Sequence, residues 1–170
     1  HGLGYLHARH LVVQELRVLE RHERHDADEE RDLACALGLL QETLEERVAG
    51  GRLREAGFGP AAQAVFAKTE AVRIVACGTS YHAASVAKYF IEQICRLPCW
   101  VEIASEYRYR NPVVPKNTLF VSVSQSGETA DTLAALRMAK QAGYLSQLAI
   151  CNVPESSLVR ESDLVMLTRA

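Results

Sequence analysis

The stretch that most constrains the fold of this chain runs from Thr118 to Ala142. An apolar segment at 119–123 is followed by Ser-Gln-Ser-Gly-Glu-Thr at 124–129, and a helical pattern begins at Ala130. The apolar positions of that helix recur at helical spacing: Leu133, Leu136 and Ala139. The stretch predicts a buried strand, a hydroxyl-rich loop and an amphipathic helix in direct succession.

Such a loop is suited to binding an anion. The first backbone N–H groups of a helix have no intrahelical partner, and its peptide dipoles place partial positive charge at that end. Ser124, Ser126 and Thr129 add hydroxyl donors, and Gly127 permits close approach or a positive φ. Each hydrogen bond to a charged oxygen contributes roughly 1.5–3 kcal/mol. The competing interpretation is that the Ser and Thr side chains only cap the helix.

Short apolar strands alternate with helical patterns from residue 73 onward. We expect strands at 73–77, 99–103, 119–123, 147–151 and 164–168, and helices at 81–95, 130–143 and 156–162. The first of these helices has a predicted apolar face made of Ala83, Val86, Phe90 and Ile94. Because parallel strands need such crossovers, the pattern predicts an α/β fold: a five-stranded parallel sheet flanked by helices, in a flavodoxin-like three-layer sandwich.

The first part of the chain, 1–59, is predicted to be a helical extension and linker. Helix-forming segments fill most of 1–48, including a mixed-charge block at 20–32, while clustered glycines predict a loop or hinge over 49–59. Pro60 suits the first turn of a helix at 61–70, with two buried contacts: Val65 and Phe66. The α/β domain is therefore placed at 60–170.

A second polar loop, Gly78-Thr79-Ser80, also follows a strand and opens a helix. Parallel sheets bind ligands beyond the carboxyl ends of their strands, where the strand order reverses. If strands 73–77 and 119–123 are neighbours, the two loops face each other across one crevice. Neither loop has the Gly-Lys-Ser/Thr or GxGxxG pattern of nucleotide-binding loops. A small phosphorylated metabolite is therefore favoured over a nucleotide.

The overall composition excludes several classes of protein. A net charge of −2 and a pI near 6.3 do not indicate the basic surface that nucleic-acid-binding proteins carry. No apolar run is long enough to span a membrane. The five cysteines include no CxxC pair, so we expect reduced thiols and a cytoplasmic location. No metal or cofactor is expected. Cys95 and Cys99 have no His or further Cys at a supporting spacing, and His22 and His25, although carboxylates lie nearby, belong to a mixed-charge block that is far more typical of an exposed helix than of a metal site.

Four segments resemble the sugar isomerase (SIS) domain, and more narrowly the first of two such domains in the family of glutamine–fructose-6-phosphate aminotransferases, or glucosamine-6-phosphate synthases. The segments are Ala-Cys-Gly-Thr-Ser-Tyr at 76–81, Val-Glu-Ile-Ala-Ser-Glu-Tyr-Arg-Tyr-Arg at 101–110, the loop and helix start at 124–133, and 149–153 with 156–161. The resemblance covers about residues 60–170, and before about residue 43 the chain does not align. His82 stands where the family has a small polar residue, and we interpret it as a residue of the helix surface.

The resemblance implies a substrate-binding role. Carried over by position, four residues would line the sugar end of the pocket: Cys77, Gly78, Thr79 and Ser80. Five would hold the phosphate: Ser80, Ser124, Gln125, Ser126 and Thr129. The family transfers ammonia from glutamine to the C2 carbonyl of fructose 6-phosphate and isomerises the product to glucosamine 6-phosphate.

The resemblance also implies what this chain lacks. The family's catalytic Glu, Lys and His lie in the second SIS domain and the C-terminal tail, so no catalytic residue is expected within this chain. The domain is expected to be truncated at its C-terminal end and inactive alone. Its implied partners are a phosphorylated hexose, the glutaminase domain and second SIS domain of a parent chain, and a second subunit in a homodimer, with no nucleic acid or membrane.

Other interpretations of single residues and of the whole chain stay open at this point. Cys77 is a nucleophile or a buried thiol at a strand end, and the latter is favoured because no base is paired with it in sequence. Glu128 is a general base or, as we expect, a residue stabilised by the dipole of the helix that follows. Arg108 and Arg110 pair with carboxylates or line an interface. The alternative function is a stand-alone SIS sugar-phosphate sensor or regulator.

Overall fold

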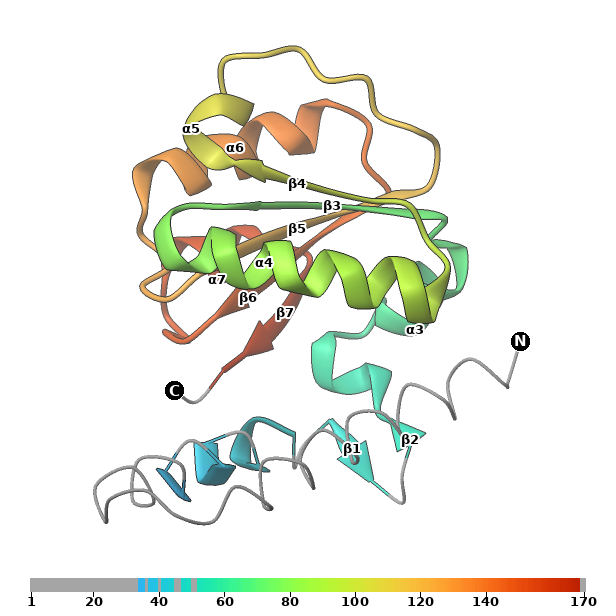
Figure 1. Ribbon diagram of the computed structural model, residues 1–170, viewed down its shortest axis with the longest axis vertical. Helices are drawn as coiled ribbons and strands as arrows, with labels where there is room; N and C mark the ends of the chain where they lie inside the picture. Colours follow the sequence, from blue (N-terminus) through green and yellow to red (C-terminus); the bar gives the residue numbers. More distant parts are fainter. Residues whose placement is uncertain (1–33, 36, 40, 45–46, 50–51, 169–170) are drawn as a thin grey trace.

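The computed structural model describes residues 34–168 except 36, 40, 45, 46, 50 and 51 (Figure 1). The mixed-charge block with His22 and His25 lies outside the described residues. Residues 34–35, 37–39 and 41–44 are helical, as expected for this part of the N-terminal extension.

The loop predicted over 49–59 is only partly correct. Strand β1 (Val48–Ala49) pairs antiparallel with β2 (Arg52–Leu53), and the 3₁₀ turn η1 (Glu55–Phe58) follows. Backbone hydrogen bonding explains the difference, since the Arg54 N–H donates to the Arg47 carbonyl at 2.6 Å beside this ladder. Phe58 then buries its ring edge-on against Phe66, with 5.4 Å between ring centroids, which fixes η1 to the domain.

The predicted five-stranded parallel sheet is confirmed. Its strands are β3 (Ala71–Ala76), β4 (Cys99–Ile103), β5 (Thr118–Ser124), β6 (Ser146–Cys151) and β7 (Leu164–Leu167). Their order is β4-β3-β5-β6-β7, with every neighbouring pair parallel. The chain thus leaves β3 toward β4 and returns to β5 on the other side, so the strand order reverses between β3 and β5.

Helices cover both faces of the sheet (Figure 1). On one face lie α3 (Ala62–Lys68), α4 (Gly78–Phe90) and the π-helical turn η2 (Ile91–Cys95). On the other lie α5 (Ala104–Tyr107), α6 (Ala130–Gln141) and α7 (Ser157–Glu161). Alternate residues of β5 serve the two cores, Phe120 on the α6 side and Leu119 with Val121 on the α4 side. The predicted apolar positions of α6 are buried: Leu133, Leu136 and Ala139.

The predicted buried face of the helix after β3 is wrong. Val86 and Phe90 are 58% and 52% exposed, and Ala83 is also exposed. The side of α4 that packs on the sheet carries Ala84, Ala87 and Ile91. Apolar residues recur at helical spacing on both sides of this helix, so periodicity alone does not distinguish the buried side. The bulkier residues favour the side that does not pack on the sheet. The helix also begins at Gly78, earlier than expected, and passes into η2 after Phe90.

The polar segment after β4 is a short helix with one buried aromatic residue. Tyr107 of α5 is fully buried, and its hydroxyl donates to that of Tyr144 at 3.1 Å. Both arginines pair with carboxylates, one of the two roles left open for them: Arg108 with Asp131 at 2.5 Å and Arg110 with Glu102 at 2.7 Å. Among the described helices, none has the length and apolar character needed to cross a bilayer.

Candidate functional site

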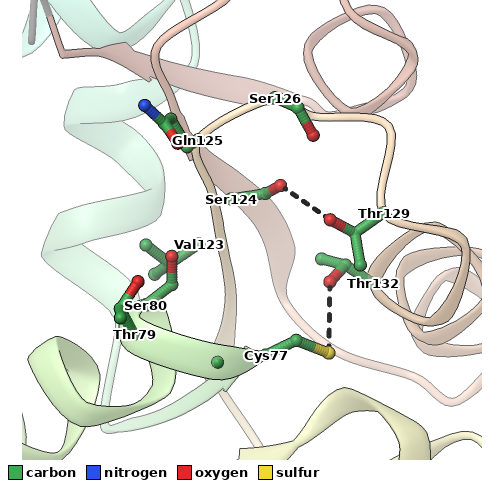
Figure 2. A pocket seen from close by; sticks show the side chains of 10 residues that line it. Cys77, Thr79, Ser80, Val123, Ser124, Gln125, Ser126, Thr129 and Thr132 are labelled. Carbon is green, nitrogen blue, oxygen red and sulfur yellow. Dashed lines mark hydrogen bonds between the residues drawn. The ribbon is translucent and has the colours of Figure 1, made fainter.

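A cavity of about 260 Å³ lies at the carboxyl ends of β3 and β5, where the strand order reverses (Figure 2). All eight residues predicted for the site line it: Cys77, Gly78, Thr79, Ser80, Ser124, Gln125, Ser126 and Thr129. Figure 2 shows the 77–80 turn and the 124–129 loop facing one another. The condition that strands 73–77 and 119–123 be neighbours is met, with Ala76 opposite Val123.

Two further residues line the cavity, Val123 and Thr132. Val123 is the residue of β5 that precedes the loop. Thr132 lies three positions after Thr129 on α6, so both side chains project from the same side of the helix. That spacing is a signal from which sequence reasoning could have found Thr132.

The N-termini of two helices border the cavity. Helix α4 begins at Gly78 and α6 at Ala130, and neither N-cap residue, Cys77 or Thr129, makes a side-chain cap hydrogen bond. Thr129 Oγ1 lies instead 3.4 Å from Ser124 Oγ. The capping interpretation therefore fails at α6, and the first-turn N–H groups of both helices favour negative charge here.

Hydrogen bonds within the loop set the direction of its hydroxyl groups. Ser124 Oγ accepts from the Gly127 N–H at 3.1 Å, and Ser126 Oγ accepts from the Glu128 N–H at 3.2 Å. A hydroxyl that accepts still has its own proton to donate. Ser126 therefore retains a donor, as does one member of the Ser124–Thr129 pair. Gly127 makes this turn possible with φ +67°, a conformation that other residues adopt at a cost.

Cys77 is a half-buried thiol in the cavity wall, more accessible than the buried strand-end thiol expected from the sequence. Thr132 Oγ1 donates to its sulfur at 3.9 Å, as drawn in Figure 2. None of the ten lining residues is His, Lys, Arg, Asp or Glu, so no neighbouring base in the cavity activates this thiol. His82 lies outside the cavity, exposed on α4, as expected for a surface residue.

The same arrangement of strands and loops is found in proteins of known family. The family model described as "SIS domain" matches residues 66–170. This chain belongs to the SIS domain family. It is 61% identical over 132 residues to the glutamine–fructose-6-phosphate aminotransferase (isomerizing) of Pseudomonas syringae pv. tomato, an alignment that covers 78% of this chain and 22% of that protein. This SIS domain therefore spans about a fifth of the length of that curated relative.

Solved structures agree with that assignment. The C-terminal domain of glucosamine-fructose-6-phosphate aminotransferase from Francisella tularensis superposes with a TM-score of 0.74 at 51% identity, covering 77% of this chain and 37% of that one. A putative phosphosugar isomerase from Salmonella typhimurium superposes with a TM-score of 0.54 at 28% identity, covering 61% and 32% of the two chains. The resemblance inferred from the four sequence segments is thus confirmed at the level of the family.

Glu128 of this SIS domain has a different role from the one predicted. It precedes the first turn of α6, and the acidic residue within that turn is Asp131. The Glu128 carboxylate is exposed, does not line the cavity, and accepts from the Ser157 N–H at 2.7 Å. That hydrogen bond lowers the pKa of the Glu128 carboxyl. The predicted place of Glu128 in the first turn of α6 is therefore wrong, and its carboxylate contacts the first turn of α7.

No group of three or more His, Cys, Asp or Glu side chains suited to a metal ion occurs in the part of the SIS domain that the structure describes. Cys95 is exposed, whereas Cys99 is buried on β4. Burial raises the pKa of the Cys99 thiol to about 11.

Proposed function

We propose that this SIS domain binds a phosphorylated hexose, fructose 6-phosphate or glucosamine 6-phosphate, as the first SIS domain of a glutamine–fructose-6-phosphate aminotransferase. The observation that carries the proposal is the convergence of eight predicted residues on one cavity between two helix N-termini. Relatives at 61% identity that carry this enzyme name favour an enzyme over a stand-alone regulator.

Within the cavity, the phosphate and the sugar have different sets of contacts that share Ser80. Ser124, Gln125, Ser126 and Thr129 of the loop, with Ser80 of the turn, hold the phosphate. Cys77, Gly78 and Thr79, together with Ser80, line the sugar end. Because no lining side chain is charged, the dianion is stabilised by backbone N–H groups, hydroxyl groups and helix dipoles.

The chemical steps need groups that do not line this cavity. Amination at C2 needs a source of ammonia, and isomerisation needs an acid–base group to move a proton between C1 and C2. We assign the first to a glutaminase domain and the second to a second SIS domain of a longer chain, in a homodimer that serves hexosamine biosynthesis. Residues 1–59 are then an extension and linker, and 60–170 the SIS domain proper. The described cysteines are all free thiols, which fits a cytoplasmic location.

The test is the substitution Ser126→Ala in the 170-residue chain, with Ser85→Ala as the matched control. Ser85 lies on α4 outside the cavity, where its hydroxyl donates to the Tyr81 carbonyl at 2.8 Å. Loss of one hydrogen bond to a charged oxygen weakens fructose 6-phosphate binding by roughly tenfold or more in the Ser126 variant, with little change in unfolding by urea. The control binds as the parent chain does. Unchanged binding together with lower stability in Ser126→Ala would mean that the loop is structural.

A further inference from the structure

The 124–129 loop rests on a segment that does not itself line the cavity, residues 151–158. The Asn152 N–H donates to the Gln125 carbonyl at 3.2 Å, and the Leu158 N–H donates to the Gly127 carbonyl at 3.1 Å. Gly127 is buried against Ser156 so closely that a Cβ atom there would lie 2.1 Å from Ser156 Oγ. One side of the loop thus faces the cavity, and its backbone is held from behind.

The Glu128 side chain adds a further hydrogen bond between the loop and the supporting segment. Its carboxylate accepts from the Ser157 N–H at 2.7 Å, a short distance typical of a charge-assisted hydrogen bond. The Glu128 N–H in turn donates to Ser126 Oγ at 3.2 Å. The position of Glu128 is therefore linked directly to the hydroxyl of Ser126, and Thr129 follows it in the chain.

We propose that Glu128 is a positioning residue for phosphate binding: its carboxylate, bound to the Ser157 N–H, fixes the backbone from which Ser126 and Thr129 present their hydroxyl groups. The proposal rests on the function proposed above. A hydroxyl displaced by a fraction of an ångström no longer points at a phosphate oxygen, so a contact outside the cavity changes affinity within it. The hydrogen bond from Ser157 lowers the pKa of the Glu128 carboxyl, as expected for a bond made to the ionised form.

A purely structural role makes a different prediction. If Glu128 only attaches α7 to the domain, another carboxylate with the same task would matter equally for binding. Glu161 is that carboxylate, since it lies on α7 and accepts from Arg137 Nε and Nη2 at 2.9 and 2.6 Å. Its partner Arg137 is on α6, so this ion pair joins α7 to α6 and not to the 124–129 loop. Glu161→Ala is therefore the matched control.

The experiment measures binding of fructose 6-phosphate and of inorganic phosphate by calorimetry, using the 170-residue chain and three variants. Glu128→Ala is expected to weaken both ligands roughly three- to tenfold, because the affected contacts are those to phosphate. Glu128→Gln recovers part of that loss, since its amide oxygen still accepts from the Ser157 N–H. Glu161→Ala binds both ligands as the parent chain does. Urea unfolding of each variant measures the structural effect separately.

Two results would overturn the positioning role while leaving the proposed function intact. One is parent-like affinity in Glu128→Ala. The other is an equal loss of affinity in Glu161→Ala, which would show that attachment of α7 alone is responsible. A parent chain that binds neither ligand would instead overturn the proposed function, and the positioning role with it.

Discussion

Replacing Gly127 by alanine tests the geometry of the loop most severely. Gly127 has φ +67°, and a Cβ added there would lie 2.1 Å from Ser156 Oγ, 2.4 Å from Ser156 Cβ and 2.8 Å from Cys151 Sγ. Ser156 and Cys151 are both buried, so neither side chain can swing into solvent. The loop must therefore move away from the 151–158 segment to accommodate the methyl group.

The expected magnitude has two parts. A non-glycine residue in the left-handed region costs about 1–2 kcal/mol, and overpacking at a buried contact costs typically about 1–3 kcal/mol. Gly127→Ala should then lower the free energy of unfolding by about 2–5 kcal/mol. Because the displaced loop carries Ser124, Ser126 and Thr129, the same variant should lose most of its affinity for fructose 6-phosphate.

Gly143 offers a control for backbone strain alone. It has φ +85°, and a Cβ there would meet no atom within 4 Å. Gly143→Ala should lower the free energy of unfolding by only about 1–2 kcal/mol and leave binding unchanged. Both variants are compared by urea unfolding monitored by circular dichroism, with extrapolation to zero denaturant. Equal losses of stability in the two variants would refute the close approach between Gly127 and Ser156.

Three further predictions concern the core and the thiols. Leu136 of α6 is fully buried, so Leu136→Ala should lower the free energy of unfolding by about 2–5 kcal/mol, and a loss below about 1 kcal/mol in urea would contradict its place in the core. Glu102 is the carboxylate partner of buried Arg73, so Glu102→Ala should cost on the order of 3 kcal/mol by leaving that guanidinium without a counter-ion. Parent-like thermal unfolding of that variant would count against the pair. A thiol with a pKa of about 11 is ionised in only about one molecule in a thousand at pH 8, so iodoacetamide should label exposed Cys35 long before buried Cys99 in native protein, as peptide mass mapping would show. Early labelling of Cys99 would contradict its burial.

Much of this fold could be predicted from local pattern. The strands of a parallel sheet covered on both faces are short continuous apolar runs, and the predicted runs at 99–103, 119–123 and 147–151 agree with β4, β5 and β6 to within one residue at each end. The meeting of the two loops followed from the same logic, because loops at the carboxyl ends of neighbouring parallel strands meet at one edge of the sheet.

What could not be predicted depends on contacts between residues distant in sequence. Glu128 binds the backbone of Ser157, 29 residues away, and nothing near Glu128 in the sequence indicates that partner. Helix α4 has two apolar faces, and the contact with the sheet decides which of them is buried. The small side chain of Ala84 fits against the sheet, whereas Val86 and Phe90 are exposed to solvent. The antiparallel pairing of β1 with β2 likewise depends on backbone hydrogen bonds, which leave no apolar pattern in so few residues.

The central claim is that the cavity at the carboxyl ends of β3 and β5 recognises the phosphate of a hexose. Calorimetric titration of the 170-residue chain with fructose 6-phosphate, glucosamine 6-phosphate and unphosphorylated fructose tests it most directly. We expect both phosphosugars to bind and fructose not to bind, because the loop hydroxyls and the helix N-termini act on the phosphate. Equal binding of fructose, or no binding of either phosphosugar, would contradict the claim.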